Sequence, residues 1–383
     1  MSKTIWHVGA WSNNYGDRAL QVGNTNILRE HCKEELQFVY IDIQKTYFSE
    51  ALIDKMNAEA DLLYIGGGGL LFNRPMDRSH SGWQFNIETK NISKIKIPIV
   101  VYGIGYNKFP YDEHVFPRTM WQNVGTLINK ADLFSVRNQG TYKIIAEHGV
   151  GADIDKICIV PDAGMFIKPN PFVHKCLEGN HIKIGINWAT DRPEQRFGDY
   201  DKSRIALSKV ISICEDLATT YEDNIRFYFI EHLVPNELCS EAKADLRNEV
   251  HERLGDKACI IYDEFEEELF PPFDYTVGFF ADLYRQMDVV LGMRGHANII
   301  PFGQNTLFID LGTHKKVKWF LEEVGCTDNF VGLDEEYYFN KAHDLVSRMI
   351  GDPLKYKKQM AVMHGAMGRV KDVFMKQAAG LLK

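Results

Sequence analysis

The chain has 383 residues, of which 45% are hydrophobic and 25% are charged, and its formal net charge is -8. This length and apolar content are enough for more than one hydrophobic core and favour two domains. The acidic balance argues against a nucleic-acid partner, although a local cluster of basic residues can still bind a small anion in an acidic protein.

The amino-terminal residues and the cysteines bear on the cellular compartment. The segment MSKTIWHVGA lacks the charged and apolar regions of a secretion signal, and no apolar run reaches the ~18 residues that a membrane helix requires. Seven cysteines are scattered singly, without the close pairs typical of a zinc site. We therefore expect a cytoplasmic protein with reduced thiols and no bound metal.

Short apolar runs alternate with helix-length segments through the first part of the sequence. These runs are TIWHVGA (4–10), QFVYIDI (37–43), DLLYIGGGG (61–69), IPIVVYGIG (97–105), DLFSVR (132–137) and ICIVPDAG (157–164). Residues 17–33 and 116–130 have the length and apolar spacing of helices that cover a sheet. The alternation is typical of βα units around a parallel sheet.

A second series of the same kind follows a segment without periodicity. Residues 167–180 (IKPNPFVHKCLEGN) contain two prolines and a glycine, as expected of a crossing between domains. The next apolar runs are IKIGINWA (182–189), IRFYFIEH (225–232), ACIIYDE (258–264), DVVLGMRGHA (288–297) and TLFIDLG (306–312). We predict two Rossmann-like α/β domains facing a cleft, at 1–175 and 176–352, and a helical tail at 353–383 that packs back on the first domain.

Ligands of open parallel sheets bind beyond the carboxyl ends of the strands, where helices begin with free N–H groups. After the first strand, Asn14 and Asp17 are candidates for the cleft, with a turn and a helix cap as the alternative. After the third strand, Gly67 and Gly68 belong to a run of four glycines that lets the backbone approach a ligand. No lysine of a P-loop follows, and close packing alone explains the run equally well.

Two further candidates follow later strands of the first domain. Arg137 comes directly after a buried strand, where its guanidinium can donate two hydrogen bonds to a carboxylate or phosphate. Asp162 ends the last strand. A structural salt bridge is the alternative for Arg137, and a cap is the alternative for Asp162.

The sharpest signal lies in DVVLGMRGHANIIPFG (288–303), where a buried strand is followed by Arg294, Gly295 and His296. A permanently charged guanidinium and a titratable imidazole at a helix start make a site for an anion that undergoes proton transfer. His232 ends another strand, and Lys315 begins a lysine cluster with Lys316 and Lys318. A structural histidine and a solvated lysine face are the alternatives for these two candidates.

Six motifs, in order, resemble the polysaccharide pyruvyl transferase family over nearly the whole chain. They are NNYGDRAL (13–20), GGGGLLF (66–72), YGIG (102–105), SVRNQGT (135–141), VPDAGMF (160–166) and GMRGHANIIPFG (292–303). The resemblance implies a glycosyltransferase-B-like fold, and transfer of pyruvate from phosphoenolpyruvate onto two hydroxyls of a sugar to form a cyclic ketal. The sugar would belong to a surface polysaccharide or its lipid-linked precursor.

The same resemblance carries over to single residues. Arg294 and His296 match the family's donor-binding element. The other matches are Asn14, Asp17, Gly67, Gly68, Arg137 and Asp162. Two positions depart from the family pattern: Asn138 stands where an aspartate is common, and Gly303 is followed by Gln304 and Asn305 where Gly-x-Pro is frequent.

The chemistry of an enol ether that carries a carboxylate and a phosphate sets the expected roles. Arg294 would bind one anionic group, Arg137 the other, and His296 would donate a proton or contact the leaving phosphate. Asp17 or Asp162 would accept a proton from the sugar. This reaction needs an acid and a base, and no cofactor besides the co-substrate phosphoenolpyruvate.

Two other functions remain open at this stage. A glycosyltransferase with a nucleotide-sugar donor would share the two-domain cleft, and a noncatalytic relative would keep the fold without turnover. The expected partners are phosphoenolpyruvate and a sugar or lipid-linked acceptor. Peripheral membrane association through that acceptor, and a homo-oligomer, are left open.

Overall fold

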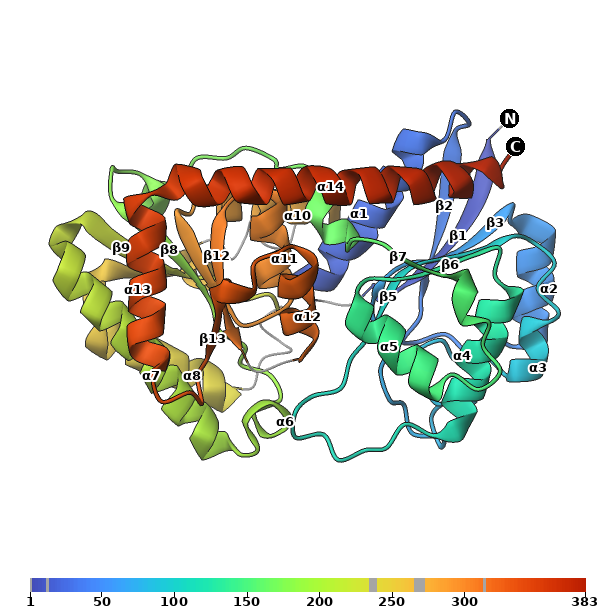
Figure 1. The fold of residues 1–383 in the computed structure, drawn as a ribbon, viewed down its shortest axis with the longest axis horizontal. Helices are drawn as coiled ribbons and strands as arrows, with labels where there is room; N and C mark the ends of the chain where they lie inside the picture. The colour runs from blue at the N-terminus through green and yellow to red at the C-terminus, as the bar shows by residue number, and fades with distance from the viewer. Residues whose placement is uncertain (1, 12–13, 234–239, 265–272, 313–314) are drawn as a thin grey trace.

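The computed structural model describes residues 2–11, 14–233, 240–264, 273–312 and 315–383. Two parallel sheets, each covered by helices, lie toward opposite ends of the long axis, and one long helix spans both (Figure 1). The fold class expected from the alternation of strands and helices is therefore confirmed. Among the described helices, none combines the length and apolarity needed to cross a lipid bilayer.

The first sheet has the strand order β2-β1-β3-β5-β6-β7, with β4 paired to β5. Its strands are β1 (Lys3–Gly9), β2 (Leu36–Asp42), β3 (Leu62–Ile65), β4 (Gly68–Leu71), β5 (Ile99–Tyr106), β6 (Leu133–Val136) and β7 (Ile157–Ile159). Its helices are α1 (Tyr15–His31), α2 (Glu50–Glu59), α3 (Thr89–Ile92), α4 (Arg118–Lys130) and α5 (Gln139–His148). The central strands β3 and β5 are almost wholly buried, as apolar runs covered on both faces should be.

The second sheet has the strand order β10-β9-β8-β11-β12-β13, which is the 3-2-1-4-5-6 order of the doubly wound fold. Its strands are β8 (Ile182–Asn187), β9 (Ile225–Phe229), β10 (Ala258–Ile260), β11 (Val289–Gly292), β12 (Leu307–Gly312) and β13 (Phe330–Gly332). Its helices are α6 (Pro193–Phe197), α7 (Tyr200–Tyr221), α8 (Ser240–Arg253), α9 (Ile261–Glu264), α10 (Phe273–Arg285), α11 (His296–Gly303), α12 (Lys315–Glu323) and α13 (Tyr338–Gly351). One detail of the sequence reading is wrong, because the apolar run at 258–264 leaves the sheet after Ile260 and continues as α9.

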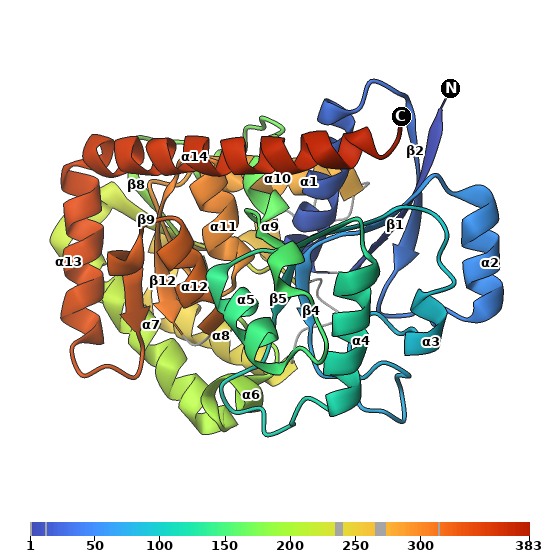
Figure 2. The same ribbon diagram turned by 45° about the vertical axis from the view of Figure 1, so that its right-hand side comes forward.

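The long helix α14 (Pro353–Gly380) runs from the second sheet back to the first (Figures 1 and 2). Near its end, Phe374 and Met375 join one apolar core with Leu20 of α1 and Tyr102 of β5. The rings of Phe374 and Tyr102 are 5.5 Å apart in an edge-to-face arrangement. The expected packing of the tail on the first domain is confirmed. Helix α14 thus connects the two halves a second time, far along the chain from the crossing at 167–180.

Candidate functional site

The loops that follow the strands of both sheets line one cleft. From the first sheet come residues after β1, in β4, after β5 and after β6, and from the second come residues after β8, β9, β11 and β12. The residues that line it include Asn14, Asp17, Gly68, Asn107, Phe109, Arg137, Asp191, Arg192, Arg196, His232, Arg294, His296 and Lys316. The cleft thus lies at the carboxyl ends of the strands, where open α/β sheets bind ligands.

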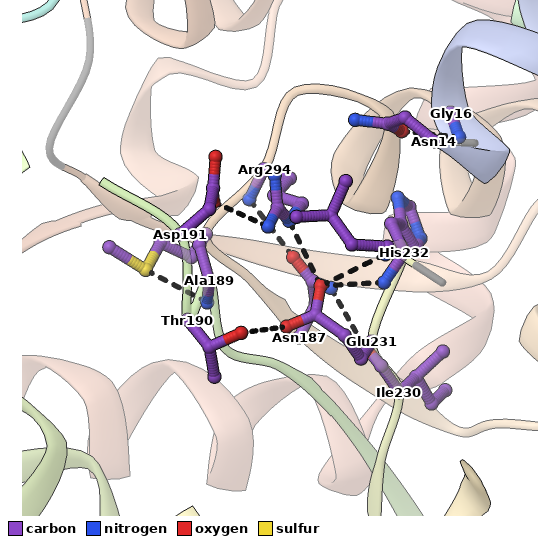
Figure 3. A network of polar contacts seen from close by, with 12 residues as sticks. Asn14, Gly16, Asn187, Ala189, Thr190, Asp191, Ile230, Glu231, His232 and Arg294 are labelled. Atoms are coloured by element: carbon purple, nitrogen blue, oxygen red, sulfur yellow. Dashed lines mark hydrogen bonds and ion pairs between the residues drawn. The ribbon is translucent and has the colours of Figure 1, made fainter. Parts of the chain in front are cut away.

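Arg294 lies at the switch point of the second sheet, between the carboxyl ends of β8 and β11. Its Nη2 donates to Asp191 Oδ1 at 2.5 Å, and its Nε donates to Glu231 Oε1 at 3.2 Å (Figure 3). Burial opposes the charge, but these two carboxylates raise the pKa of Arg294 above its ordinary value. Arg294 is therefore a fixed cation in the cleft.

The backbone of the Arg294 loop is also held in place. The Arg294 N–H donates to Asn187 Oδ1 at 3.1 Å, at the end of β8. Asn298 Nδ2 donates to the carbonyls of Gly292 and Arg294, at 3.1 and 3.2 Å. Because side chains of β8 and α11 fix this loop from both sides, the guanidinium is pre-organised for a ligand.

His296 begins α11 and lies between the two halves of the molecule. Its Nε2 is 3.4 Å from Asp162 Oδ1, and its ring packs against the start of α1 so closely that a Cβ on Gly16 would be 2.7 Å from Nδ1. Nε2 is buried and makes no hydrogen bond within the described residues. The ring of His296 lines the cleft, and an imidazole in this position is suited to exchange a proton with a ligand.

Asp162 joins the imidazole to a second cation. Its Oδ2 accepts from Arg137 Nη1 at 3.2 Å, and its Oδ1 accepts from the Gly164 N–H at 2.9 Å. Burial disfavours its charge, but the charges of His296 and Arg137 hold its pKa well below the usual range. Only 3% of the Asp162 surface is exposed, so this ionised carboxylate supports the two cations from behind the cleft. The cap expected for Asp162 and the salt bridge expected for Arg137 are both present.

Arg137 reaches the cleft by lying across β5. A Cβ on Gly105 would be 2.3 Å from Arg137 Nε, so only glycine leaves room for the side chain there. The side chain lines the cleft on the first-sheet side. Arg137, Asp162 and His296 are thus brought together. The order of these residues in the sequence does not predict this contact.

The start of α1 carries the next two candidates. Asn14 Oδ1 accepts from the N–H groups of Gly16 and Asp17, so Asn14 is the N-cap of α1. It also pairs with Leu233 beyond β9, so the cap lies against the second half of the molecule. Both Asn14 and Asp17 line the cleft. Asn14 is therefore both a helix cap and a residue that lines the cleft.

The glycine run serves both close packing and the lining of the cleft. A Cβ on Gly67 would be 2.7 Å from the Gly103 carbonyl, so this glycine allows close approach to β5, and it does not line the cleft among the described residues. Gly68 does line the cleft and has a φ of 108°, which disfavours any other residue.

His232 is buried at the cleft wall. Its Nε2 lies 2.6 Å from the Tyr284 hydroxyl, and burial followed by the charge of Arg294 lowers its pKa well below the ordinary value. His232 is therefore a neutral imidazole beside a permanent cation. The side chain of Lys315, the remaining candidate, lies outside the described residues, whereas its neighbour Lys316 lines the cleft.

Sequence reasoning missed the segment that follows β8. Asp191 accepts from Arg294 and from Arg196 Nη2, the latter at 3.0 Å, and so joins two guanidinium groups. Arg192, Arg196 and Lys316 have their charges 5.0 to 5.9 Å from the ring centre of Phe109, which comes from the first half. A search beyond the carboxyl ends of the strands would have found Asp191 and Arg192, because only Thr190 separates them from the run IKIGINWA.

Lys316 completes the group of cations. Its Nζ donates to Asn107 Oδ1 at 3.0 Å. Burial, followed by the nearby charges of Arg137 and Arg196, lowers the pKa of Lys316 to about 7. Among the described residues, the cleft is lined by five basic side chains (Arg137, Arg192, Arg196, Arg294 and Lys316) and two acidic ones (Asp17 and Asp191). This excess of positive charge fits a ligand with more than one anionic group.

In the described part of the chain, no group of three or more His, Cys, Asp or Glu side chains is arranged to hold a metal ion.

Comparison with solved structures places the fold. A UDP-GlcNAc 2-epimerase from Neisseria meningitidis bound to UDP-GlcNAc matches with a TM-score of 0.54 and 11% identity, over 94% of this chain and 94% of that one. An E. coli trehalose-6-phosphate structure bound with UDP-2-fluoro glucose matches with a TM-score of 0.59 and 11% identity, over 99% of both chains. S. aureus MnaA with UDP matches with a TM-score of 0.56 and 12% identity, over 94% and 90%. The chain has the two-domain Rossmann-like GT-B fold.

Comparison with sequences gives the family. No curated protein sequence matches this chain. The family model for polysaccharide pyruvyl transferase matches residues 14–312, which include every cleft residue named above except Lys316. With its cationic cleft between two Rossmann-like halves, this chain belongs to the polysaccharide pyruvyl transferase family.

Proposed function

We propose that this protein transfers pyruvate from phosphoenolpyruvate onto two hydroxyls of a sugar in a surface polysaccharide or its precursor, forming a cyclic ketal. The observation that carries the proposal is the placement of Arg137, Arg294 and Lys316 around the imidazole of His296 in one cleft. A donor with a carboxylate and a phosphate needs two cationic contacts, and its enol needs a proton donor.

The proposed reaction begins with protonation of the donor. His296, as an imidazolium, gives a proton to the methylene carbon of phosphoenolpyruvate, and an oxocarbenium ion forms at the adjacent carbon. One sugar hydroxyl attacks this carbon and loses its proton. Departure of phosphate then regenerates an oxocarbenium ion, which the second hydroxyl attacks to close the ketal. Of the two hydroxyl protons, one restores His296 and the other leaves with the phosphate. The sum is donor plus diol giving ketal plus phosphate, and no cofactor takes part.

The hydrogen bonds of each charged side chain indicate its role in the proposed reaction. The hydrogen bonds of Arg294 use Nε and Nη2, and Nη1 makes none within the described residues, so we assign it to an anionic group of the donor. Arg137 takes the second anionic group. Asp162 stabilises the imidazolium of His296 from behind, as an ion partner 3.4 Å away. Asp17 lines the cleft and Asp162 does not, so we assign the proton of the sugar hydroxyl to Asp17.

A nucleotide-sugar transferase remains the second candidate, because three solved structures of this fold contain UDP or a UDP-sugar. Thermal-shift measurements with phosphoenolpyruvate and with UDP- and GDP-sugars distinguish the two, since a ligand that binds the folded form raises its melting temperature. Stabilisation by a nucleotide sugar alone would replace the proposal by this alternative.

The direct test is mass spectrometry of candidate glycans incubated with phosphoenolpyruvate and enzyme, looking for an added carboxyethylidene group and equimolar phosphate. Removing one well-placed proton-transfer group costs about 10² to 10⁴ in rate. We expect a loss in this range for His296→Ala. His251→Ala, at an exposed position of α8, is the matched control and should keep full activity. Activity of His296→Ala within a few-fold of the wild type would refute the role of His296.

A further inference from the structure

A second hollow, the side groove, lies next to the cleft between the two halves of the molecule. The first half contributes residues between 106 and 112, at and after the end of β5, and the second contributes the end of β12, helix α12 and the segment around β13. Phe109 and Lys316 line both hollows, so the side groove continues the cleft. Its volume is about 640 Å³. Pockets of about 300 to 1,000 Å³ hold drug-sized ligands, so the side groove has room for more than one sugar ring.

Four aromatic side chains line the side groove: Tyr106, Phe109, Trp319 and Phe330. The partly exposed Trp319 of α12 packs so closely against the backbone of α5 that a Cβ on Gly140 would collide with its indole ring. Phe330 packs in the same way against Gly312, at the end of β12. The ring centres of Trp319 and Tyr106 lie 6.2 Å apart, with the ring planes at 48°. Because only glycine fits beneath Trp319 and Phe330, these rings are fixed before a ligand binds.

The balance of charge distinguishes the side groove from the cleft. Among the described residues, the cleft has five basic and two acidic side chains, whereas the side groove has three lysines and three carboxylates. The charged residues of the side groove are Lys108, Lys316, Lys318, Asp112, Asp334 and Glu335. Without an excess of either sign, the side groove favours a neutral ligand that offers hydrogen-bond donors and acceptors. Sugars have this character, and their apolar C–H faces pack on the negative face of an aromatic ring.

We propose that the side groove binds the neutral sugar units that flank the reacting sugar of the acceptor glycan. The inference rests on the proposed function, because it assigns the side groove to the acceptor of that reaction. The reacting sugar lies in the cleft beside the donor, and its neighbours along the glycan lie against Trp319 and the charged residues of both halves. The protein then recognises an oligosaccharide, and the contacts in the side groove add to the affinity without touching the donor.

The test is binding of the full-length protein to an array of neutral oligosaccharides and of the monosaccharides that compose them. Phosphoenolpyruvate is left out, so that binding is measured without turnover. We expect the wild type to bind at least one oligosaccharide, and to bind it more tightly than its monosaccharides. Trp319→Ala should bind that oligosaccharide at least about tenfold more weakly, as truncation of a central tryptophan contact commonly does. Tyr40→Ala removes an exposed ring on β2, at the far edge of the first sheet, and should bind like the wild type.

A second variant covers the case in which Trp319→Ala does not fold. Asp334 is exposed, so Asp334→Ala should keep the wild-type melting temperature and still weaken binding of the same oligosaccharide. Calorimetric titration with phosphoenolpyruvate provides the control for the cleft. Neither Trp319 nor Asp334 lines the cleft, so both variants should bind phosphoenolpyruvate with the affinity of the wild type.

The outcomes separate this inference from the proposed function. The inference is overturned if no oligosaccharide binds, if the wild type and both variants bind equally, or if only anionic glycans or nucleotide sugars bind through Trp319. Equal KM values for a monosaccharide and an oligosaccharide acceptor would also overturn it, although the ketal product would still support the proposed function. Conversely, oligosaccharide binding through Trp319 without any carboxyethylidene product would overturn the proposed function and leave the side groove as a sugar-binding site.

Discussion

Lys316 is expected to make donor binding depend on pH above neutrality. The pKa of this lysine is lowered to about 7, and its ammonium form is the one that attracts a phosphate. Binding that requires the charged form weakens by up to tenfold for each pH unit above 7, so the affinity at pH 9 should be about 50-fold lower than at pH 7, or about 2.3 kcal/mol. The free phosphate is already doubly ionised above about pH 7, so the donor itself contributes little to the change.

The assay is calorimetric titration of the protein with phosphoenolpyruvate from pH 7 to 9, without acceptor, so that chemical steps do not interfere. Lys316→Arg keeps a permanent charge, and its affinity should stay nearly constant over this range. Lys316→Met should bind weakly at every pH, with an equally flat profile. Parallel curves for the wild type and Lys316→Arg would refute the assignment of the pH dependence to Lys316.

The same lysine has the opposite effect on stability. Because its pKa is lower in the folded state than in the unfolded chain, the unfolded state binds more protons above pH 7. The free energy of unfolding of the ligand-free wild type, relative to Lys316→Met, should therefore rise with pH from about 7 to 10 by at most about 1.4 kcal/mol per unit. Denaturant titrations at several pH values measure this difference.

Three further substitutions test the support of the site and of the fold. Gly16→Ala places a Cβ 2.7 Å from the His296 ring, so the ring must shift, and we expect at least a tenfold loss of kcat by steady-state kinetics together with a lower melting temperature. Asp191→Asn removes the partner of Arg294 and Arg196, and should destabilise the protein by about 3 to 5 kcal/mol in denaturant titrations unless an anion is added to the cleft. Phe374→Ala opens the core under α14 and should cost about 3 to 5 kcal/mol by the same measurement, with no specific effect on donor affinity once folded.

Much of the cleft could be predicted because parallel sheets concentrate ligand-binding groups at one edge. Arg137, Arg294 and His296 follow buried strands directly, and all three line the cleft. Their mutual contacts could not be predicted, since the link runs through Asp162, whose distance from the imidazole depends on how the two halves pack. The sequence order contains no information on that packing.

The residues that were missed show where periodicity stops being informative. Arg192 adopts a left-handed backbone with φ 54° before the short α6, a geometry that no pattern in TDRPEQRF indicates. Lys316, which lines the cleft from α12, is the neighbour in sequence of the lysine that was named as a candidate. One residue corresponds to about 100° of helical rotation, which is finer than a boundary predicted from sequence.

An acidic protein keeps a cationic cleft by placing carboxylates behind its arginines. Glu231 contacts Nε of Arg294, and Asp162 contacts Nη1 of Arg137, yet neither carboxylate lines the cleft. Carboxylates in these positions offset the cost of burying each guanidinium and fix its orientation, while they leave the remaining N–H groups to a ligand. An anionic ligand then meets cations that are already ordered, so little reorganisation is needed when charge moves during the reaction. The net charge of the whole chain therefore predicts little about its ligand. The N–H groups of each guanidinium that remain available to a ligand predict much more.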